Sequence, residues 1–259
     1  MSIEHVVMFS GGAGSWCAAK RVAHLKPTLL FADTKVESPD LYEFIKLAAA
    51  DLGCELVVVE DGRTPFEVFK DKRFLGNSRI ASCSEYLKQK PCAKWIDENC
   101  DPATATLYIG IDWSEVHRLP AVERGWSPFK IVAPLCERPY LSKDQVLEML
   151  VAAGLPVPKA YTDGFPHNNC MEQGCVRGGQ AYWRHLLRMR PEVFAATEQR
   201  EREMGEFLGR PVTMLKETVN GQVKGLSLTE IRKRVETQPE LLDGLDWGGC
   251  GCFVSEDAA

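Results

Sequence analysis

Near the start of the chain an apolar run passes directly into a glycine turn, Val6-Val7-Met8-Phe9-Ser10-Gly11-Gly12-Ala13-Gly14-Ser15. The residues that follow, 16–23, predict a helix. A strand, a glycine turn and a helix in this order suit an anion, because backbone N–H groups and the positive end of the helix dipole converge on one point. The hydroxyls of Ser10 and Ser15 would add two donors. The turn lacks the Gly-Lys-Ser/Thr ending of a Walker loop and is not a Gly-x-Gly-x-x-Gly turn. It therefore predicts either a phosphate cradle of another kind or an ordinary connection between strand and helix.

The composition of the chain predicts a soluble globular protein. Its 259 residues are 45% hydrophobic and 26% charged, enough for one large α/β domain with an appendage. No apolar run approaches the length of about 18 residues that a membrane span requires. Because the N-terminus leads directly into a strand, without a basic and apolar leader, we expect a cytoplasmic protein with no membrane partner. The net charge of −5 argues against sequence-independent binding of nucleic acid.

Apolar runs alternate with helical segments through the first half of the chain. Runs at 28–32, 56–60, 106–111 and 129–133 predict four more strands, and residues 41–52 and 143–153 predict helices. Such alternation predicts a doubly wound, Rossmann-like parallel sheet with helices on both faces. Ligands of these sheets bind beyond the carboxyl ends of the strands, where the glycine turn, Asp33-Thr34 and residues 110–115 would meet.

Beyond about residue 160 the composition changes. Prolines, glycines, two asparagines and two cysteines form a loop-rich connection, and helices are predicted at 179–190, 191–208 and 227–236. We therefore expect two parts: a ligand-binding α/β domain over 1–160, and a helical region with cysteines over 161–259.

Several segments resemble, in order, the motifs of one family. The turn is similar to a Ser-Gly-Gly-x-Asp-Ser loop, with Gly14 in place of the acid. Four later segments are similar to further motifs of the family. The segment Asp33-Thr34-Lys35-Val36-Glu37-Ser38 is similar to its Asp-Thr…Glu-Thr motif, and Cys83-Ser84-Glu85-Tyr86-Leu87-Lys88 is similar to its Cys-x-x-x-Leu-Lys motif. The segment Gly110-Ile111-Asp112-Trp113-Ser114-Glu115, with Arg118, is similar to its Gly-x-Arg-x-x-Glu motif, and Pro134-Leu135 through Gly154-Leu155-Pro156 is similar to its Pro-Leu…Gly-Leu-Pro motif. Up to about residue 175, the chain resembles the 3′-phosphoadenosine-5′-phosphosulfate (PAPS) reductase-like branch of the adenine nucleotide alpha hydrolase-like superfamily, the PP-loop ATP pyrophosphatases.

The resemblance implies an adenine nucleotide, ATP or a relative, bound by the domain at 1–160. The residues of the turn would hold its phosphates: Ser10, Gly11, Gly12, Gly14 and Ser15. Residues at the other strand ends would contact the rest of the nucleotide: Asp33, Thr34, Gly110 and Glu115. The catalytic residues would be Cys83, Lys88 and Arg118, the two cations by neutralising phosphate charge. From the residues alone, Asp33 also fits a cap before a helix, and Lys88 and Arg118 fit solvated surface charges.

At Gly14 the chain departs from the family that it resembles. The resemblance implies that ATP pyrophosphatases use an acid here to organise the metal and the phosphates. Without that acid, a nucleotide handled without metal, as in a reductase, fits more easily than cleavage of Mg-ATP. The predicted cofactors are therefore the nucleotide and, optionally, Mg²⁺.

Ten cysteines in a chain expected in the cytosol are not a disulfide framework, because the cytosol keeps thiols reduced. Two close pairs stand among glycines: Cys170 with Cys175, and Cys250 with Cys252. Four such thiolates can hold one iron–sulfur cluster or one zinc ion, and the spacings differ from the C-x2-C pairs of zinc ribbons. Because some members of the resembling family carry a [4Fe–4S] centre, we expect that cluster, with zinc as the alternative and Cys83 as a substitute ligand. Unrelated thiols are the remaining interpretation.

These features predict an enzyme of sulfur chemistry. It would either reduce a sulfonucleotide, or use ATP to adenylate a substrate such as a nucleic-acid base before sulfur displaces AMP. A sulfur or electron donor protein and a second copy of the chain are the expected partners. The alternatives are a nucleotide-binding regulatory protein without turnover, and a zinc-stabilised nucleic-acid-binding module that uses Arg184 and Arg188. The helix of these arginines also fits inward packing of Trp183, with the arginines in solvent.

Overall fold

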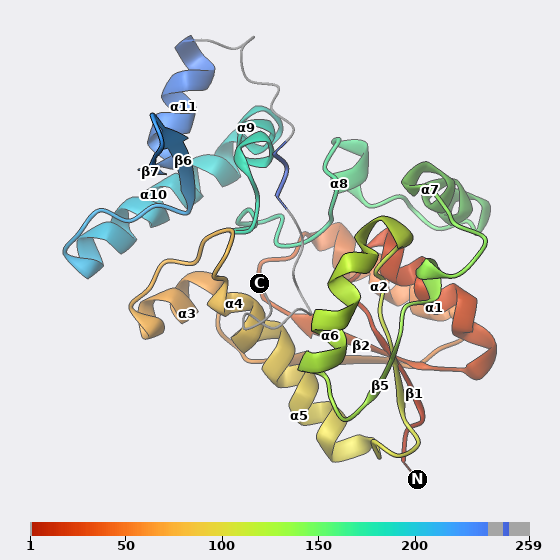
Figure 1. Ribbon diagram of the computed structural model, residues 1–259. Helices are drawn as coiled ribbons and strands as arrows, with labels where there is room; N and C mark the ends of the chain where they lie inside the picture. The colour runs from red at the N-terminus through yellow and green to blue at the C-terminus, as the bar shows by residue number, and fades with distance from the viewer. Residues whose placement is uncertain (1, 238–245, 249–259) are drawn as a thin grey trace.

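The computed structural model describes residues 2–237 and 246–248. Its centre is a five-stranded parallel sheet with the order β3-β2-β1-β4-β5 (Figure 1). The strands are β1 (His5–Met8), β2 (Thr28–Asp33), β3 (Leu56–Glu60), β4 (Thr106–Tyr108) and β5 (Lys130–Val132). The predicted doubly wound α/β fold is confirmed, and each strand lies within or close to a predicted apolar run.

Helices cover both faces of the sheet. On one face α1 (Ala13–Val22), α2 (Pro39–Leu52) and α7 (Lys143–Ala152) share a core that includes Trp16, Phe44 and Leu150. On the other face α5 (Lys90–Asn99) and α6 (Leu119–Gly125) bury Ile96 and Val122. The two covered faces explain why the strands are continuous apolar runs rather than alternating ones.

The carboxyl ends of all five strands meet at one edge of the sheet, because the strands are parallel. The glycine turn follows β1 at this edge, Asp33 ends β2, and residues 109–112 leave β4 there. The predicted strand at 106–111 is therefore shorter than expected, since its last three residues belong to the edge rather than to the sheet.

The C-terminal part has a core of its own. It contains α9 (Gln180–Met189), α10 (Pro191–Leu208), the hairpin of β6 (Leu215–Val219) and β7 (Gln222–Leu226), and α11 (Leu228–Thr237), at the upper left of Figure 1. The buried Glu201 joins these elements, because its carboxylate accepts hydrogen bonds from the amides of Met214 and Leu228. Phe66 and Phe69 of α3 (Pro65–Lys72) complete this core. The boundary near residue 160 stays a prediction.

Short helical segments connect these elements. They are α4 (Ser82–Ser84), α8 (Lys159–Thr162), the 3-10 helices η1 (Ala23–Leu25), η3 (Trp113–Arg118) and η4 (Pro134–Cys136), and the π-helix η2 (Glu85–Gln89). The helix predicted at 143–153 begins with a capping box, in which the Ser142 hydroxyl and the Gln145 side chain each bond the other residue's backbone amide. Within residues 2–237 and 246–248, no helix has the length and apolar character to cross a bilayer.

Helix α9 packs as the sequence predicts, with one exception. Trp183 and Leu186 are fully buried, as expected for its inward face. Arg184, expected in solvent, is only 9% exposed, and its guanidinium donates to the Gln180 side chain at 3.1 Å. The arginine stripe is therefore partly an interior feature.

Candidate functional site

The glycine turn follows β1 and opens helix α1. Gly11 has a φ of +74°, and a Cβ atom there would lie 3.0 Å from side-chain atoms of Ile45 and Leu41, so glycine is required. Gly12 is the N-cap of α1, and its carbonyl accepts a hydrogen bond of 2.9 Å from the Ser15 hydroxyl. The turn thus directs the first-turn amides of α1, which lack acceptors within the helix, towards the sheet edge.

A second glycine allows the end of β4 to approach this turn. A Cβ atom at Gly110 would lie 3.0 Å from backbone atoms of Ser15 and 3.2 Å from the carbonyl carbon of Gly14. A larger residue at position 110 would push the two segments apart. A Cβ atom at Gly14 would lie 3.5 Å from the Gly110 carbonyl oxygen, which is an ordinary contact. The space at Gly14 therefore does not itself exclude the acid that the resembling family carries there.

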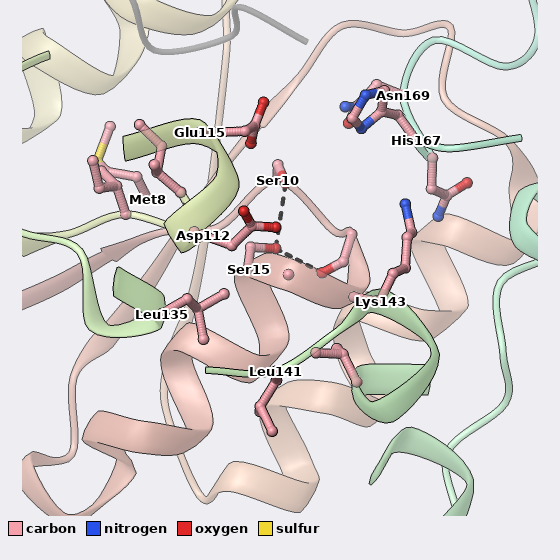
Figure 2. A pocket seen from close by; sticks show the side chains of 18 of the residues that line it. Met8, Ser10, Ser15, Asp112, Glu115, Leu135, Leu141, Lys143, His167 and Asn169 are labelled. Carbon is pink, nitrogen blue, oxygen red and sulfur yellow. Dashed lines mark hydrogen bonds between the residues drawn. The ribbon is translucent and has the colours of Figure 1, made fainter. Parts of the chain in front are cut away.

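These segments line a cavity of about 170 Å³, named the nucleotide cavity after the ligand that the family resemblance implies. Figure 2 shows Asp112 and Glu115 on one side of the turn, and Lys143 and His167 on the other. An apolar wall is made by side chains from the strand ends and the segments above them: Met8, Ile109, Ile111, Val122, Leu135, Leu141 and Val146. Amide donors, charges and an apolar wall together suit a ligand that joins a flat ring to anionic groups.

Two cations and a neutral imidazole line this cavity. Arg118 forms an ion pair with Glu115, and the Lys143 ammonium lies 4.6 Å from the centre of the Tyr161 ring. Burial, assisted by the charges of Lys143 and Arg118, lowers the pKa of His167 to about 4. His167 is therefore neutral at pH 7, and the positive charge of the wall comes from Lys143 and Arg118.

Two further side chains hold the walls in place. The Tyr161 hydroxyl, from α8, accepts a hydrogen bond of 3.0 Å from the amide of Ala13. On the opposite wall, Asp112 caps η3 and accepts hydrogen bonds from the Ser114 amide at 2.8 Å and hydroxyl at 2.6 Å. Asp112 stands in a motif of the family resemblance that gave it no role, and Tyr161 was not predicted. The position of Asp112 directly after a strand end was the signal that could have identified it.

Most of the predicted nucleotide residues line this one cavity: Ser10, Gly12, Gly14, Ser15, Gly110, Glu115 and, of the predicted catalytic residues, Arg118. Gly11 shapes the turn from the side that packs on α2. Sequence analysis missed His167, Asn168 and Asn169, which reach the cavity from the loop after α8. Nothing in their local pattern distinguishes them from an ordinary polar loop.

The predicted ribose or adenine ligands at the end of β2 lie outside the lining of this cavity. Asp33 accepts hydrogen bonds from the Tyr42 hydroxyl at 2.6 Å and the Lys35 amide at 2.8 Å. Burial raises its pKa, but these hydrogen bonds outweigh burial and hold the pKa of Asp33 below its usual value. Thr34 lines a second cavity instead.

This second cavity, of about 20 Å³, is lined by three cysteines and is called the thiol cavity below. Cys83 comes from α4, and Cys170 and Cys175 come from the loop before α9. Lys88 also lines it, and Asn169 lines both cavities. The structure thus brings the predicted catalytic pair, Cys83 and Lys88, together with two of the predicted metal ligands, beside the nucleotide cavity.

A buried carboxylate organises the thiol cavity. Glu37 is 3% exposed, and it accepts a hydrogen bond of 2.5 Å from the Cys170 amide and one of 2.9 Å from the Thr34 hydroxyl. The Lys88 ammonium lies 3.5 Å from the same carboxylate, and Lys88 is only 6% exposed. The interpretation of Lys88 as a solvated surface charge is therefore wrong. Sequence analysis placed Glu37 in a motif without assigning it this role.

Cys170 is a protonated thiol in this surrounding. A hydrogen bond with the Cys175 side chain, burial and the Glu37 charge together raise the pKa of Cys170 well above its usual value. Among the residues that the structure describes, no group of three or more histidine, cysteine, aspartate or glutamate side chains is arranged to hold a metal ion. The other two predicted ligands, Cys250 and Cys252, lie outside the described residues.

Residues 246–248 lie against the start of α9. The Gly179 amide donates to the Trp247 carbonyl at 3.1 Å, and the Ala181 amide donates to the Asp246 carbonyl at 2.8 Å. Gly248 forms a β-bridge with Gly178, in the loop that carries Cys175. The chain therefore returns to the cysteine loop shortly before the position of Cys250.

Comparison with known proteins gives similarity in structure only. No family model matches the chain, and no curated protein matches it. Among solved structures it is similar to the PAPS reductase from Candida auris in a phosphate complex, with 18% identity over 62% of this chain and 78% of that chain, and a TM-score of 0.45. It is similar to the NMN synthetase from Francisella tularensis, with 17% identity over 64% and 66% of the two chains and a TM-score of 0.44.

The NH3-dependent NAD synthetase from Campylobacter jejuni, in complex with the nitrate ion, is matched over 81% of this chain and 88% of its own, with 16% identity and a TM-score of 0.39. With identities and TM-scores this low, these similarities assign no activity to the chain. Its function has to be argued from the two cavities.

Proposed function

We propose that the protein binds an adenine nucleotide in the nucleotide cavity and transfers the adenylyl group of ATP to an acceptor, as the activating step of a sulfur transfer. One observation carries this proposal: the amides at the start of α1 face the same cavity as Lys143, Arg118 and an apolar wall. The amides and cations suit the phosphates, and the apolar wall suits the adenine ring. The resemblance of the turn to a pyrophosphate-binding loop supports the same assignment.

In adenylyl transfer the protein mainly positions the reactants and stabilises the charge that develops. A carbonyl oxygen of the acceptor attacks the α-phosphorus, the bond to the bridging oxygen breaks, and pyrophosphate leaves with the electron pair. Negative charge grows on the bridging oxygen, so Lys143, Arg118 and the α1 amides stabilise the transition state more than the ground state. Hydrosulfide released by a donor protein then attacks the activated carbon, the bond from that carbon to the AMP oxygen breaks and AMP leaves with the electron pair, and loss of the thiol proton gives the thiocarbonyl.

The placement of the thiols favours adenylation over reduction of a sulfonucleotide. Reduction requires a thiolate that reaches the sulfur of the bound nucleotide. Of the described residues, no cysteine lines the nucleotide cavity, and Cys83, Cys170 and Cys175 line the neighbouring thiol cavity instead. We therefore place reduction second, with thiols from outside the described residues as its only source of a nucleophile.

The residues of the nucleotide cavity fit a Mg²⁺ ion. Two carboxylates, Asp112 and Glu115, line the cavity with the turn, and Mg²⁺ is typically held by one or two carboxylates together with substrate phosphates. Asp112 would supply the acid that Gly14 lacks. When bound, the ion would polarise the phosphoryl oxygens.

A cysteine-held [4Fe–4S] cluster is a separate proposal, supported by the three thiols that line one cavity and by the return of residues 246–248 to the cysteine loop. Cys83, Cys170 and Cys175 would be three of its ligands, and Cys250 or Cys252 the fourth. This donor set fits an iron–sulfur cluster, and Lys88 and Arg177 would offset its charge. When bound, the cluster would supply one-electron chemistry or an iron that binds sulfur.

Calorimetry with ATP, ADP, AMP and PAPS tests the nucleotide proposal. We expect ATP to bind, and Lys143→Gln to weaken its binding about tenfold, the cost of one charge-assisted hydrogen bond to phosphate. Lys46→Gln, an exposed lysine of α2, is the control. Release of pyrophosphate with a carbonyl acceptor supports adenylation, and release of sulfite from PAPS supports reduction instead. ATP binding without either product supports the regulatory protein. The absence of binding by any adenine nucleotide contradicts the proposal.

Metal analysis of anaerobically purified protein tests the cluster. About four iron atoms per chain and an absorption band at about 400 nm are expected for a [4Fe–4S] centre. Cys83→Ser and Cys175→Ser should lose the iron, whereas Cys54→Ser, far from this cavity in the first core, should keep it. Stoichiometric zinc without iron supports the zinc alternative, and a metal-free protein with intact nucleotide binding contradicts both.

A further inference from the structure

The strand β3 forms one edge of the sheet, and no other strand of the described residues lies on its outer side. The carbonyl of Glu55, directly before β3, accepts a hydrogen bond of 2.8 Å from the Leu29 amide of β2. Because hydrogen bonding alternates between the two sides of a strand, the odd-numbered residues of β3 bond to β2. The amides and carbonyls of Leu56, Val58 and Glu60 therefore point away from the sheet, where they can pair with another strand.

The two edges of the sheet differ in how they are protected. The strand β5, at the other edge, has three residues and begins with the exposed Lys130. A short edge strand that carries a lysine resists pairing with other chains. The strand β3 has five residues, Leu-Val-Val-Val-Glu, without lysine or proline, and none of the five is buried. It is therefore the edge that suits a partner strand.

Val58 leaves an apolar surface at the middle of this edge. Its side chain is 51% exposed, whereas Phe31, its neighbour in register on β2, is buried in the core shared with α2. Leu56 lies on the same face of the sheet, two residues earlier, and packs against that core. Val58 thus faces the side that α2 covers and still lies beyond its cover. A strand added at this edge would remove Val58 from water.

The strand is complementary to a second copy of itself. Two β3 strands can pair antiparallel about a two-fold axis at Val58, which then lies opposite its own copy. Leu56 lies opposite Glu60 of the second copy, and Val57 lies opposite Val59. The even-numbered positions supply the hydrogen bonds of this ladder, and these are the positions whose amides and carbonyls point outward. Any other register about a two-fold axis would pair fewer of the five residues.

The charges of the strand permit this pairing. Glu60 is the only charged residue of β3, and it forms an ion pair with Lys35 of its own chain. In this register Glu60 lies opposite Leu56, so no like charges face each other within the paired strands. Asp61, directly after the strand, is paired with Arg63. A second copy is therefore a partner that both the backbone and the charges of β3 fit.

We propose that two copies of the chain associate through β3, so that their five-stranded sheets join into one continuous sheet about a two-fold axis at Val58. The same surface patch serves both copies, as a closed two-fold dimer requires. The glycine turn follows β1, and β2 separates β1 from this edge. The inference therefore does not depend on the proposed function.

Light scattering after gel filtration tests the association. We expect wild type at micromolar concentration to have twice the mass of one chain, which is 28.9 kDa. Val58→Lys should raise the dissociation constant of the dimer at least about tenfold, because two lysines would face each other at the axis. Val223→Lys, at a valine of β7 that is 69% exposed, is the control and should leave the mass unchanged. Circular dichroism reports whether both variants are folded.

Cross-linking tests the register separately. In Val58→Cys, two thiols would face each other across the axis at a Cα separation of about 5.5 Å, which a disulfide can span. With oxidised glutathione this variant should form more covalent dimer than wild type or Val223→Cys, which contain the same native cysteines. A monomeric wild type at micromolar concentration overturns the proposal. A dimer that is unchanged in Val58→Lys and gains no cross-link in Val58→Cys overturns it as well, because the copies would then meet at another surface.

Discussion

The nucleotide cavity and the thiol cavity meet at Asn169 and differ in how the chain builds them. The first is made of strand ends and the start of α1, so short segments determine most of its wall. The second joins α4, the end of β2 and the loop before α9, and its wall includes Lys88 and Cys170, which both contact the buried Glu37 carboxylate. The nucleotide cavity is therefore formed mainly by the edge of the sheet. The thiol cavity is formed by segments that are distant in the sequence and that pack around one buried charge pair.

Among single substitutions, removal of the Glu37 carboxylate should have the largest effect on the thiol cavity and on the stability of the protein. Glu37→Ala would remove the carboxylate that lies 3.5 Å from the buried Lys88 ammonium, and with it the acceptor of the Cys170 amide. We expect a loss of about 3–5 kcal/mol in the free energy of unfolding, measured by urea denaturation. Glu43→Ala, at an exposed position of α2, should change it by less than about 0.5 kcal/mol. If the loss comes from the uncompensated Lys88 charge, Glu37→Met with Lys88→Met should recover part of it, although the Cys170 amide still lacks its acceptor.

A matched pair of glycines tests the local construction of the nucleotide cavity. Gly11 and Gly53 both have positive φ, of +74° and +61°, but only at Gly11 would a Cβ atom meet neighbouring side chains, at 3.0 Å. Gly53→Ala should cost about 1 kcal/mol for its backbone alone. Gly11→Ala should cost about 2–4 kcal/mol in unfolding experiments and weaken ATP binding, because crowding adds to the backbone strain. Equal costs at the two sites would show that the fit against α2 is unimportant.

The half-buried His167 gives the nucleotide cavity a pH dependence in the weakly acidic range. Its pKa is lowered to about 4 in the folded chain, from about 6.5 when unfolded, so the unfolded state binds the extra proton first as the pH falls. Stability should decrease from about pH 6.5 towards pH 4, with a loss from this residue of about 2 kcal/mol between pH 7.5 and pH 5.

Urea denaturation of wild type and His167→Gln across this range measures the effect. Both proteins share every carboxylate, so the difference between their pH profiles isolates the imidazole. Parallel profiles would show that His167 is solvated enough to titrate normally.

The smallest expected effect is at Tyr161, which joins the turn to α8. Tyr161→Phe removes the acceptor of the Ala13 amide and should cost about 1 kcal/mol in unfolding. ATP binding should weaken by a factor of a few, because the turn loses one support, or strengthen if a phosphate oxygen takes the freed amide. Tyr140→Phe, which keeps its ring, is the control, and an unchanged Tyr161→Phe would show that the hydrogen bond does not position the turn.

The sequence predicts the sheet and the nucleotide cavity well because both depend on local patterns. The apolar run at 28–32 became β2, in which all six residues are buried, and the helix predicted at 143–153 became α7. The Gly110 segment was expected to meet the glycine turn, and their backbones are so close that position 110 accepts only glycine.

The parts that escaped prediction depend on contacts between distant segments. Asp33 was expected at the nucleotide, but the Tyr42 hydroxyl and the Lys35 amide engage it at the end of β2. Lys88 was weighed as a surface charge, because its burial against Glu37 exists only after η2 packs against β2. His167 and Asn169 occupy a loop whose approach to the turn no local pattern encodes.

The side chain of Asn169, common to both cavities, has a thermodynamic consequence. A ligand that shifts this amide in one cavity changes the wall of the other, so the free energies of binding at the two places are linked. Linkage of this kind is reciprocal. If a bound nucleotide changes the equilibrium between two states of the thiols by some factor, then the same change of state at the thiols changes the nucleotide affinity by that factor. An ATP titration would then give different affinities for protein with oxidised and with reduced cysteines.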